Sequence, residues 1–195
     1  MRAIQEKTDS DLIRKYLSGD ERSFRTLVQR YQTQIFTFIL RMIGDRAAAQ
    51  DVFQEVFVRA SQNLAAYQES DRFGGWIFTI ARNLCHDHLR RRQLELNLFS
   101  RNSWDDSDAV ALDVIPSDAP LADAVLEQQE LAVLLSDAIA ALPIPQREVL
   151  LLRQHSQLTF KEIAGTLDRP LNTVLSQMRH ALCAIRNYLE KEYAK

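Results

Sequence analysis

The chain has 195 residues, 46% of them hydrophobic, and a formal net charge of −2, as expected for a globular protein of one large or two small domains. Five glycines and five prolines favour a mostly helical fold. No run approaches the roughly 20 apolar residues of a membrane span, and the N-terminus lacks the apolar core of a signal peptide, so we expect a cytoplasmic protein.

The small net charge conceals an uneven distribution. Residues 1–92 carry 15 Lys and Arg against 11 Asp and Glu, residues 93–122 carry 1 against 6, and residues 123–195 carry 8 against 9. Neither outer segment is basic enough to hold duplex DNA tightly by itself, because affinity from phosphate neutralisation grows with the number of cationic contacts. If the chain binds DNA, we expect it to do so with help.

Three helical patterns fill the first 62 residues, each preceded by a residue that can cap a helix. Thr8 or Asp9 begins the first, Asp20 the second and Asp45 the third, and Gly44 closes the second. The third pattern places carboxylates on the surface of an otherwise basic domain. Its outward residues are Asp51, Gln54, Glu55 and Arg59.

Residues 63–72 break the periodicity and are interpreted as a loop that leads into a long amphipathic helix over residues 73–92, FGGWIFTIARNLCHDHLRRR. Arginine, asparagine and histidine on its polar face suit nucleic acid, because Arg forks onto phosphates and guanine edges and Asn pairs with adenine. The same face fits a solvated helix whose basic last turn complements the helix dipole, and this segment alone leaves both interpretations open. The outward residues of the helix over residues 73–92 are Arg82, Asn83, His86, Asp87, Arg90 and Arg91.

Residues 93–122 contain scattered apolar residues, a cluster of acids and two prolines, and we predict a flexible acidic linker there. A second helical domain follows over residues 123–195. The fold class predicted is therefore all-α, with two small helical domains, residues 1–92 and 123–195, joined by this linker.

The end of the second domain has a helix-turn-helix pattern. Thr159 and Glu162 match a capping box, Asp168 and Arg169 form a turn, and Pro170 begins the last helix. Small polar side chains near the start of that helix suit the major groove, although an ordinary helical hairpin remains the alternative. The exposed residues are Asn172, Thr173, Ser176, Gln177, Arg179 and His180, and the apolar stripe predicted to be buried is Val174, Met178, Ala181, Leu182, Ile185 and Leu189.

The sequence favours neither an enzyme nor a metal site. It has no phosphate-binding glycine loop, no nucleophile motif and no cluster of carboxylates for a metal. Cys85, His86 and His88 cannot converge on one ion, because adjacent helical positions point about 100° apart. We expect no cofactor, two buried or half-buried thiols at Cys85 and Cys183, and a surface or DNA-facing position for His155.

Taken together, four stretches resemble a known family. DVFQEVFVRA, FGGWIFTIARNLCHDHLRRR and LPIPQREVLLLR followed by LTFKEIAGTLDRPLNTVLSQMRHAL are similar to the two domains of bacterial extracytoplasmic-function sigma factors, the small members of the sigma-70 family. The similarity runs in order from about residue 10 to about residue 190. It implies a dissociable subunit of RNA polymerase that selects and opens promoters.

The resemblance also implies a role for each surface. The face of Asp51, Gln54, Glu55 and Arg59 would dock on the coiled coil of the polymerase β′ subunit. The helix of residues 73–92 would read and melt the −10 element, after a loop that matches the family's pocket for a flipped base. Aromatic rings can stack on unpaired bases, which makes Tyr67, Phe73 and Trp76 candidates, although Trp76 also lies on the packing stripe.

The helix-turn-helix would read the −35 element and contact the polymerase β flap, and the linker would thread toward the active site. Asp168 stands where the family commonly has Gly, and Leu175 and Gln177 stand where it often has basic residues, which puts a conventional −35 preference in doubt. Family members are usually held inactive by an anti-sigma factor, often at the membrane. The alternative to a sigma factor is a stand-alone helix-turn-helix regulator, which leaves the Asp51 face without a purpose.

Overall fold

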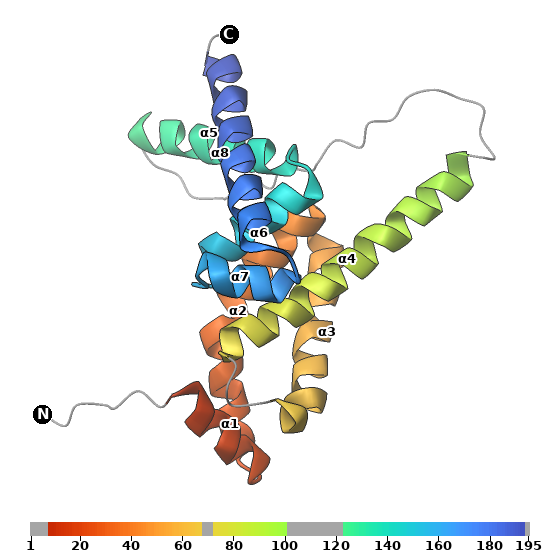
Figure 1. Cartoon of the computed structure of the whole chain (residues 1–195), viewed down its shortest axis with the longest axis vertical. Coiled ribbons are helices and arrows are strands. Elements are labelled where there is room, and N and C mark those ends of the chain that lie inside the picture. The colour runs from red at the N-terminus through yellow and green to blue at the C-terminus, as the bar shows by residue number, and fades with distance from the viewer. Residues whose placement is uncertain (1–7, 68–71, 101–122, 194–195) are drawn as a thin grey trace, which may run out of the picture.

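The computed structural model describes residues 8–67, 72–100 and 123–193, apart from the side chains of residues 99–100 and 123–130. The described residues form α-helices and one short 3-10 helix, with no strand among them, which confirms the predicted all-α class (Figure 1). In chain order the elements are α1 (Asp9–Leu17), α2 (Glu21–Ile43), α3 (Arg46–Asn63), η1 (Leu64–Ala66), α4 (Phe73–Ser100), α5 (Asp123–Ala140), α6 (Ile144–His155), α7 (Phe160–Leu167) and α8 (Leu171–Tyr193).

The predicted caps set the ends of the first three helices. Thr8 begins α1 in a capping box with Asp11. At the start of α2 the Asp20 side chain accepts a hydrogen bond from the backbone N–H of Arg22. At the start of α3 the Asp45 side chain accepts one from the backbone N–H of Ala48. Gly44 ends α2 in the left-handed region, with φ of 78°. Local sequence therefore determines where these helices begin and end.

Helices α1 to α4 pack around an apolar core that runs along α2. The rings of Phe38 and Phe78 meet edge to face with centroids 5.4 Å apart. Ile35, Phe38 and Ile77 are fully buried, and removing a side chain of this size from water contributes about 1.5–3 kcal/mol to stability. The core holds α4 across α2 and α3, which positions the polar side of α4.

The predicted end of α4 at Arg92 is wrong, since the helix continues to Ser100. Residues 93–98 contain no Gly or Pro, and nothing local stops the helix. This part of α4 projects from the body of the molecule, with Leu94, Leu96 and Leu98 exposed (Figure 1). The rest of the predicted linker, residues 101–122, lies outside the described residues.

Helices α7 and α8 form the predicted helix-turn-helix. Thr159 and Glu162 make the capping box, and Asp168 adopts a left-handed conformation with φ of 49° and ψ of 50°. Two predictions for α8 are wrong, because Leu182 is 52% exposed and Cys183 is exposed. The second half of α8 extends beyond α6 and α7, so α5 packs along only part of its surface (Figure 1).

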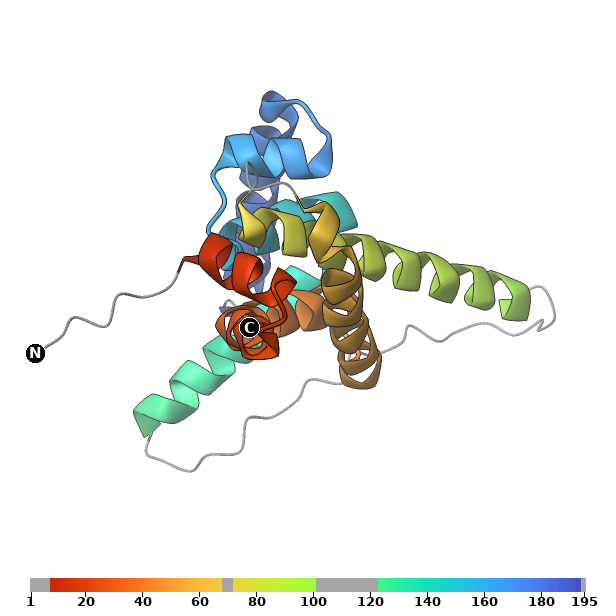
Figure 2. The ribbon, with the colours of Figure 1, turned by 90° about the horizontal axis from the view of Figure 1, so that it is seen from below.

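The C-terminal helices pack directly against the N-terminal ones. Helix α2 contacts α5 and α6, and α4 contacts α7 (Figures 1 and 2). Arg147 of α6 joins the two groups, because its Nη1 donates to the carbonyl oxygen of Met42 at 3.1 Å and its Nη2 donates to that of Leu142 at 3.0 Å. These carbonyls lie at or near helix ends, where acceptors lack a partner within the helix.

The left-handed residue of the helix-turn-helix yields a test. Replacing Asp168 by Gly should raise the free energy of unfolding by about 0.5–1 kcal/mol, because Gly adopts positive φ without steric cost. Replacing it by Val should lower that free energy by about 1–2 kcal/mol. Urea unfolding followed by circular dichroism measures the free energy of unfolding of both variants. If Asp168→Gly is less stable than Asp168→Val, the explanation from the left-handed backbone is contradicted.

Candidate nucleic-acid interface

The outward face of α3 is open to solvent. Asp51, Gln54 and Arg59 are exposed, and Glu55 is partly exposed. Glu55 accepts a hydrogen bond from Arg59 Nε at 2.7 Å, an i,i+4 ion pair at the surface. The carboxylates predicted to face outward do so, and they are accessible to a partner.

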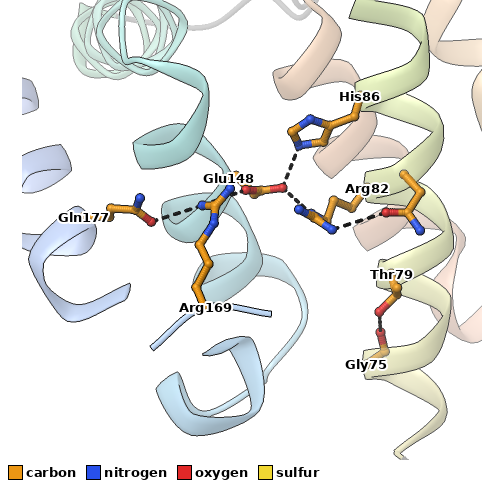
Figure 3. Close-up of polar contacts among 8 residues, drawn as sticks. Gly75, Thr79, Arg82, His86, Glu148, Arg169 and Gln177 are labelled. Atoms are coloured by element: carbon orange, nitrogen blue, oxygen red, sulfur yellow. Dashed lines mark hydrogen bonds and ion pairs between the residues drawn. The ribbon is translucent and has the colours of Figure 1, made fainter. Parts of the chain in front are cut away.

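The polar face of α4 divides into two parts. Asn83 and Arg91 are exposed, as is Arg90, which pairs with Asp87 at 3.2 Å. Arg82 and His86, one turn apart, point instead toward α6 and are not free (Figure 3). Arg82, with 19% of its side chain exposed, therefore needs a rearrangement before it can contact a nucleic acid, whereas 37% of the His86 side chain is exposed.

The aromatic residues at the start of α4 form one cluster. The Phe73 ring lies 5.6 Å from that of Trp76 and 5.9 Å from that of Tyr67, and the Tyr67 and Trp76 rings are 5.3 Å apart. Phe73 is only 3% exposed, so in this structure it is a core residue and not an open platform for a base. Tyr67 and Trp76 are half-buried.

The partner of Arg82 and His86 is Glu148, a fully buried residue of α6 (Figure 3). Its Oε1 lies 2.5 Å from Arg82 Nε and 2.8 Å from His86 Nε2. Its Oε2 lies 3.2 Å from Arg169 Nη1, an ion pair without the alignment of a hydrogen bond. One carboxylate thus joins α4, α6 and the turn of the helix-turn-helix.

The environment of Glu148 favours its charged form. Burial alone would raise the pKa of this carboxyl, but hydrogen bonds from His86 and Arg82, together with their charge, lower the pKa below its usual value. Because the folded pKa lies below the unfolded one, the contribution of Glu148 to stability is present at neutral pH and is lost as the pH falls through the folded value. Burial of the Cys85 thiol, together with the nearby charge of Glu148, raises the pKa of that thiol.

The contacts continue into the helix predicted to read DNA. Arg169 Nη1 donates to Gln177 Oε1 at 3.2 Å, which connects Glu148 to α8 (Figure 3). Gln177 and Ser176 are partly exposed. The other predicted contact residues of α8 are all exposed: Asn172, Thr173, Arg179 and His180.

A polar cavity of about 350 Å³ lies where the loop before α4 meets the turn after α6. Tyr31, Tyr67 and Arg72 line it from the N-terminal helices, and Ser156 and Gln157 line it from the C-terminal ones. Gln157 adopts a left-handed conformation with φ of 57°. The turn of residues 156–158 therefore shares this cavity with Tyr67 and Phe73 of the aromatic cluster.

An apolar contact between Leu158 and Gly75 lies beside this cavity. A Cβ atom built on Gly75 would lie 3.5 Å from Leu158 Cδ2, and Leu158 is only 3% exposed. Leu158 therefore packs closely against this side of α4, at a distance that still leaves room for a Cβ atom at position 75. Arg72 and Glu162 add an exposed ion pair of 3.2 Å at the edge of this contact.

Sequence reasoning missed Glu148, although the sequence contains a signal. In α6 this residue follows Ile144 by four positions and precedes Leu151 and Leu152 by three and four, which places it on the apolar side of the helix. An acid at such a position requires a buried cationic partner. Nothing in the spacing identifies Arg82, 66 residues earlier, as that partner.

Two protein families match this chain. Residues 27–95 match the family Sigma-70 region 2, and residues 132–184 match the family Sigma-70, region 4. The chain belongs to the sigma-70 family, in its extracytoplasmic-function group. It is thus an alternative sigma factor that directs transcription initiation, a non-enzymatic role in this family.

Similar sigma factors match over nearly the whole chain. The ECF RNA polymerase sigma factor SigW of Bacillus subtilis is 29% identical over 91% of this chain and 94% of its own length. The RNA polymerase sigma-H factor of Pseudomonas aeruginosa is 28% identical over 96% of each chain. The ECF RNA polymerase sigma-E factor of Escherichia coli is 28% identical over 95% of this chain and 96% of its own.

Two solved structures share the fold. CnrH, solved in complex with the cytosolic domain of CnrY, has a TM-score of 0.67 and 19% identity, covering 95% of this chain and 99% of that one. The sigma factor RpoE of Bartonella quintana, solved in complex with the anti-sigma factor NepR, has a TM-score of 0.68 and 19% identity, covering 86% and 96%.

The predicted surface or DNA-facing position of His155 is wrong, because this residue is half-buried at the end of α6. Its Nε2 atom has no hydrogen-bond partner among the described residues. Burial and the positive charge of Arg41 in α2 lower the pKa of His155 to about 4. The contact between α2 and α6 therefore favours the neutral form of the His155 ring.

This histidine should make the sigma factor less stable in mild acid. Between the unfolded pKa of about 6.5 and the folded pKa of about 4, the unfolded chain binds a proton that the folded chain does not, so the free energy of unfolding falls as the pH falls. His155→Gln should reduce that loss, and His180→Gln, at an exposed position, should not. Urea unfolding at about pH 7 and about pH 4.5 measures the difference, and equal pH dependence in the wild type and His155→Gln would contradict the explanation.

Proposed function

We propose that this sigma factor binds core RNA polymerase through α3 and contacts promoter DNA through α4 and α8. The single observation that carries the proposal is the match to regions 2 and 4 in one chain and in this order. The accessible carboxylates of α3 support the polymerase contact, assigned to the β′ coiled coil. The exposed polar start of α8 supports the −35 contact, with the β flap as a second partner of these helices.

The residues assigned to the −10 element fall into two sets. Asn83, Asp87, Arg90 and Arg91 are available on α4 as the chain stands. Arg82 and His86 would be fully available after the C-terminal helices move away, because Glu148 of α6 binds them here, whereas Tyr67 and Trp76 are half-buried. The proposed N-terminal domain extends to residue 100, where α4 ends, and the proposed C-terminal domain begins at residue 123.

An anti-sigma factor is a further proposed partner. It is supported by the two similar structures, one of CnrH with the cytosolic domain of CnrY and one of the sigma factor RpoE with the anti-sigma factor NepR. No helix in the described part of this chain has the length and low charge needed to cross a membrane. Association with a membrane face would therefore come through that partner.

Transcription in vitro tests the proposal as a whole. The purified chain and core polymerase should together initiate on DNA from upstream of the chain's own gene, and neither should do so alone. Failure of the chain to associate with core polymerase would overturn the proposal, and so would tight, specific duplex binding by the chain without polymerase.

The α3 face can be tested by charge reversal. Asp51→Lys should weaken binding to core polymerase at least about tenfold, which corresponds to about 1.4 kcal/mol, because a like charge replaces a complementary one. Glu190→Lys makes the same change on α8, at an exposed residue paired with Arg186, and should have little effect. Fluorescence anisotropy of labelled chain measures both, and equal affinities would show that α3 is not the docking face.

The basic end of α4 can be tested by salt dependence. Arg91→Ala should lower the salt dependence of promoter binding by the holoenzyme by roughly one phosphate contact, without changing its sequence preference. Arg186→Ala removes an exposed arginine of α8 and is the matched control. Filter binding over a salt series gives the slope, and an unchanged slope for Arg91→Ala would remove this residue from the DNA contact.

A further inference from the structure

The second half of α8 carries an apolar stripe that reaches the surface. Leu182 is 52% exposed and Tyr193 is 67% exposed, and Leu189, between them in the sequence, is half-buried. Together with Ile185 these side chains line an open groove of about 530 Å³ along the helix. This half of α8 extends beyond α6 and α7 (Figure 1). Leu182 and Tyr193 are therefore accessible to a partner.

The stripe has the spacing of a two-stranded coiled coil. Leu182, Arg186, Leu189 and Tyr193 follow one another after four, three and four residues, which places them on one side of the helix. A single exposed leucine is ordinary on a protein surface, whereas an apolar groove bordered by charged residues is typical of a contact with another protein. The partner that fits this groove is a helix with an apolar stripe of its own.

The charges beside the groove indicate which helix fits. Arg186 and Glu190 lie one turn apart and form an ion pair, with Nε of the arginine 2.7 Å from Oε1 of the glutamate. If two copies of α8 pack antiparallel about a two-fold axis near the middle of the stripe, Arg186 of each copy lies beside Glu190 of the other, and Leu182 lies opposite Tyr193. A parallel pair would instead place Arg186 against Arg186. The surface is therefore complementary to itself in the antiparallel orientation.

We propose that the free chain forms a symmetric dimer in which the exposed stripes of two α8 helices pack antiparallel. Each copy removes Leu182, Leu189 and Tyr193 of the other from water, and this burial drives the association. Two pairs of Arg186 with Glu190 form between the chains and fix the register. The contact spans roughly 16 Å along α8, about three turns, so we expect a weak dimer that dissociates on dilution.

The dimer surface is separate from the surfaces assigned to promoter DNA and to the polymerase coiled coil. The α3 face belongs to another helix, and Asn172 and Thr173 lie at the opposite end of α8. The β flap, a proposed partner of the C-terminal helices, would compete with the second copy for α8. That competition rests on the proposed function, whereas the dimer is a property of the free chain and is tested without polymerase.

Sedimentation equilibrium measures the dimer. The average mass of the wild-type chain should rise from that of a monomer toward twice that value as its concentration increases. Leu182→Asp should lower the association constant at least about tenfold, because it places a charge in the apolar contact. Leu98→Asp is the matched control, since Leu98 is 63% exposed on the projecting end of α4, and it should change the constant by less than about threefold.

Charge exchange shows whether the ion pairs form between chains. Arg186→Glu and Glu190→Arg each place like charges beside one another in the dimer, and each should lower self-association at least about fivefold. An equal mixture of the two variants restores opposite charges at both positions, so it should form a mixed dimer about as strongly as the wild type does. Lys191→Glu makes the same charge change as Arg186→Glu at an exposed residue on the side of α8 opposite Leu182, and it should not weaken the dimer.

The dimer is overturned if the wild-type chain remains a monomer at every concentration, in which case the groove belongs to a different partner. It is also overturned if Leu98→Asp weakens association as much as Leu182→Asp, or if the mixed charge variants do not associate. Circular dichroism of each variant shows whether it is folded, and Tyr193→Asp tests the same contact if Leu182→Asp is not. Dilute chain, as used to measure polymerase binding, is monomeric, so the dimer does not affect that measurement.

Discussion

The arrangement of this sigma factor depends on one buried carboxylate. Glu148 has no contact with solvent, and a charge in that position persists only when cations surround it. Arg82 and Arg169 supply them from two other parts of the chain, and His86 adds a hydrogen bond. Losing one of these partners leaves an uncompensated buried charge. The contacts of Glu148 therefore fix the relative position of these segments more than they add stability.

This constraint separates the functions of two neighbouring helices. The outward side of α3 takes no part in the contact between domains, so its carboxylates remain available to a partner. One side of α4 is committed to α6, and the same arginine and histidine that suit a DNA strand are held by a protein carboxylate. The proposed binding of polymerase and the proposed contact with DNA therefore use different surfaces of the same chain.

The boundary between the domains differs in kind from their interiors. Helices α1 to α4 are held by large apolar side chains such as Phe38 and Phe78, whose burial is lost only on unfolding. The boundary instead relies on Glu148, on Arg147 at helix-end carbonyls and on the contact of Leu158 with Gly75. Water and phosphate can replace most of these polar partners, which makes the boundary the part of the structure suited to open.

The sequence by itself determined the helices, their caps and the family, because periodicity and capping are local: Thr8, Asp20, Asp45 and the Thr159–Glu162 box all act within four residues. It also placed the α3 carboxylates outward. Only the tertiary structure decided that Phe73 is core, that His155 is half-buried, that α4 runs to Ser100, and that Arg82 and His86 meet Glu148. A side chain's partner more than 60 residues away depends on how the helices pack, and no local pattern carries that information.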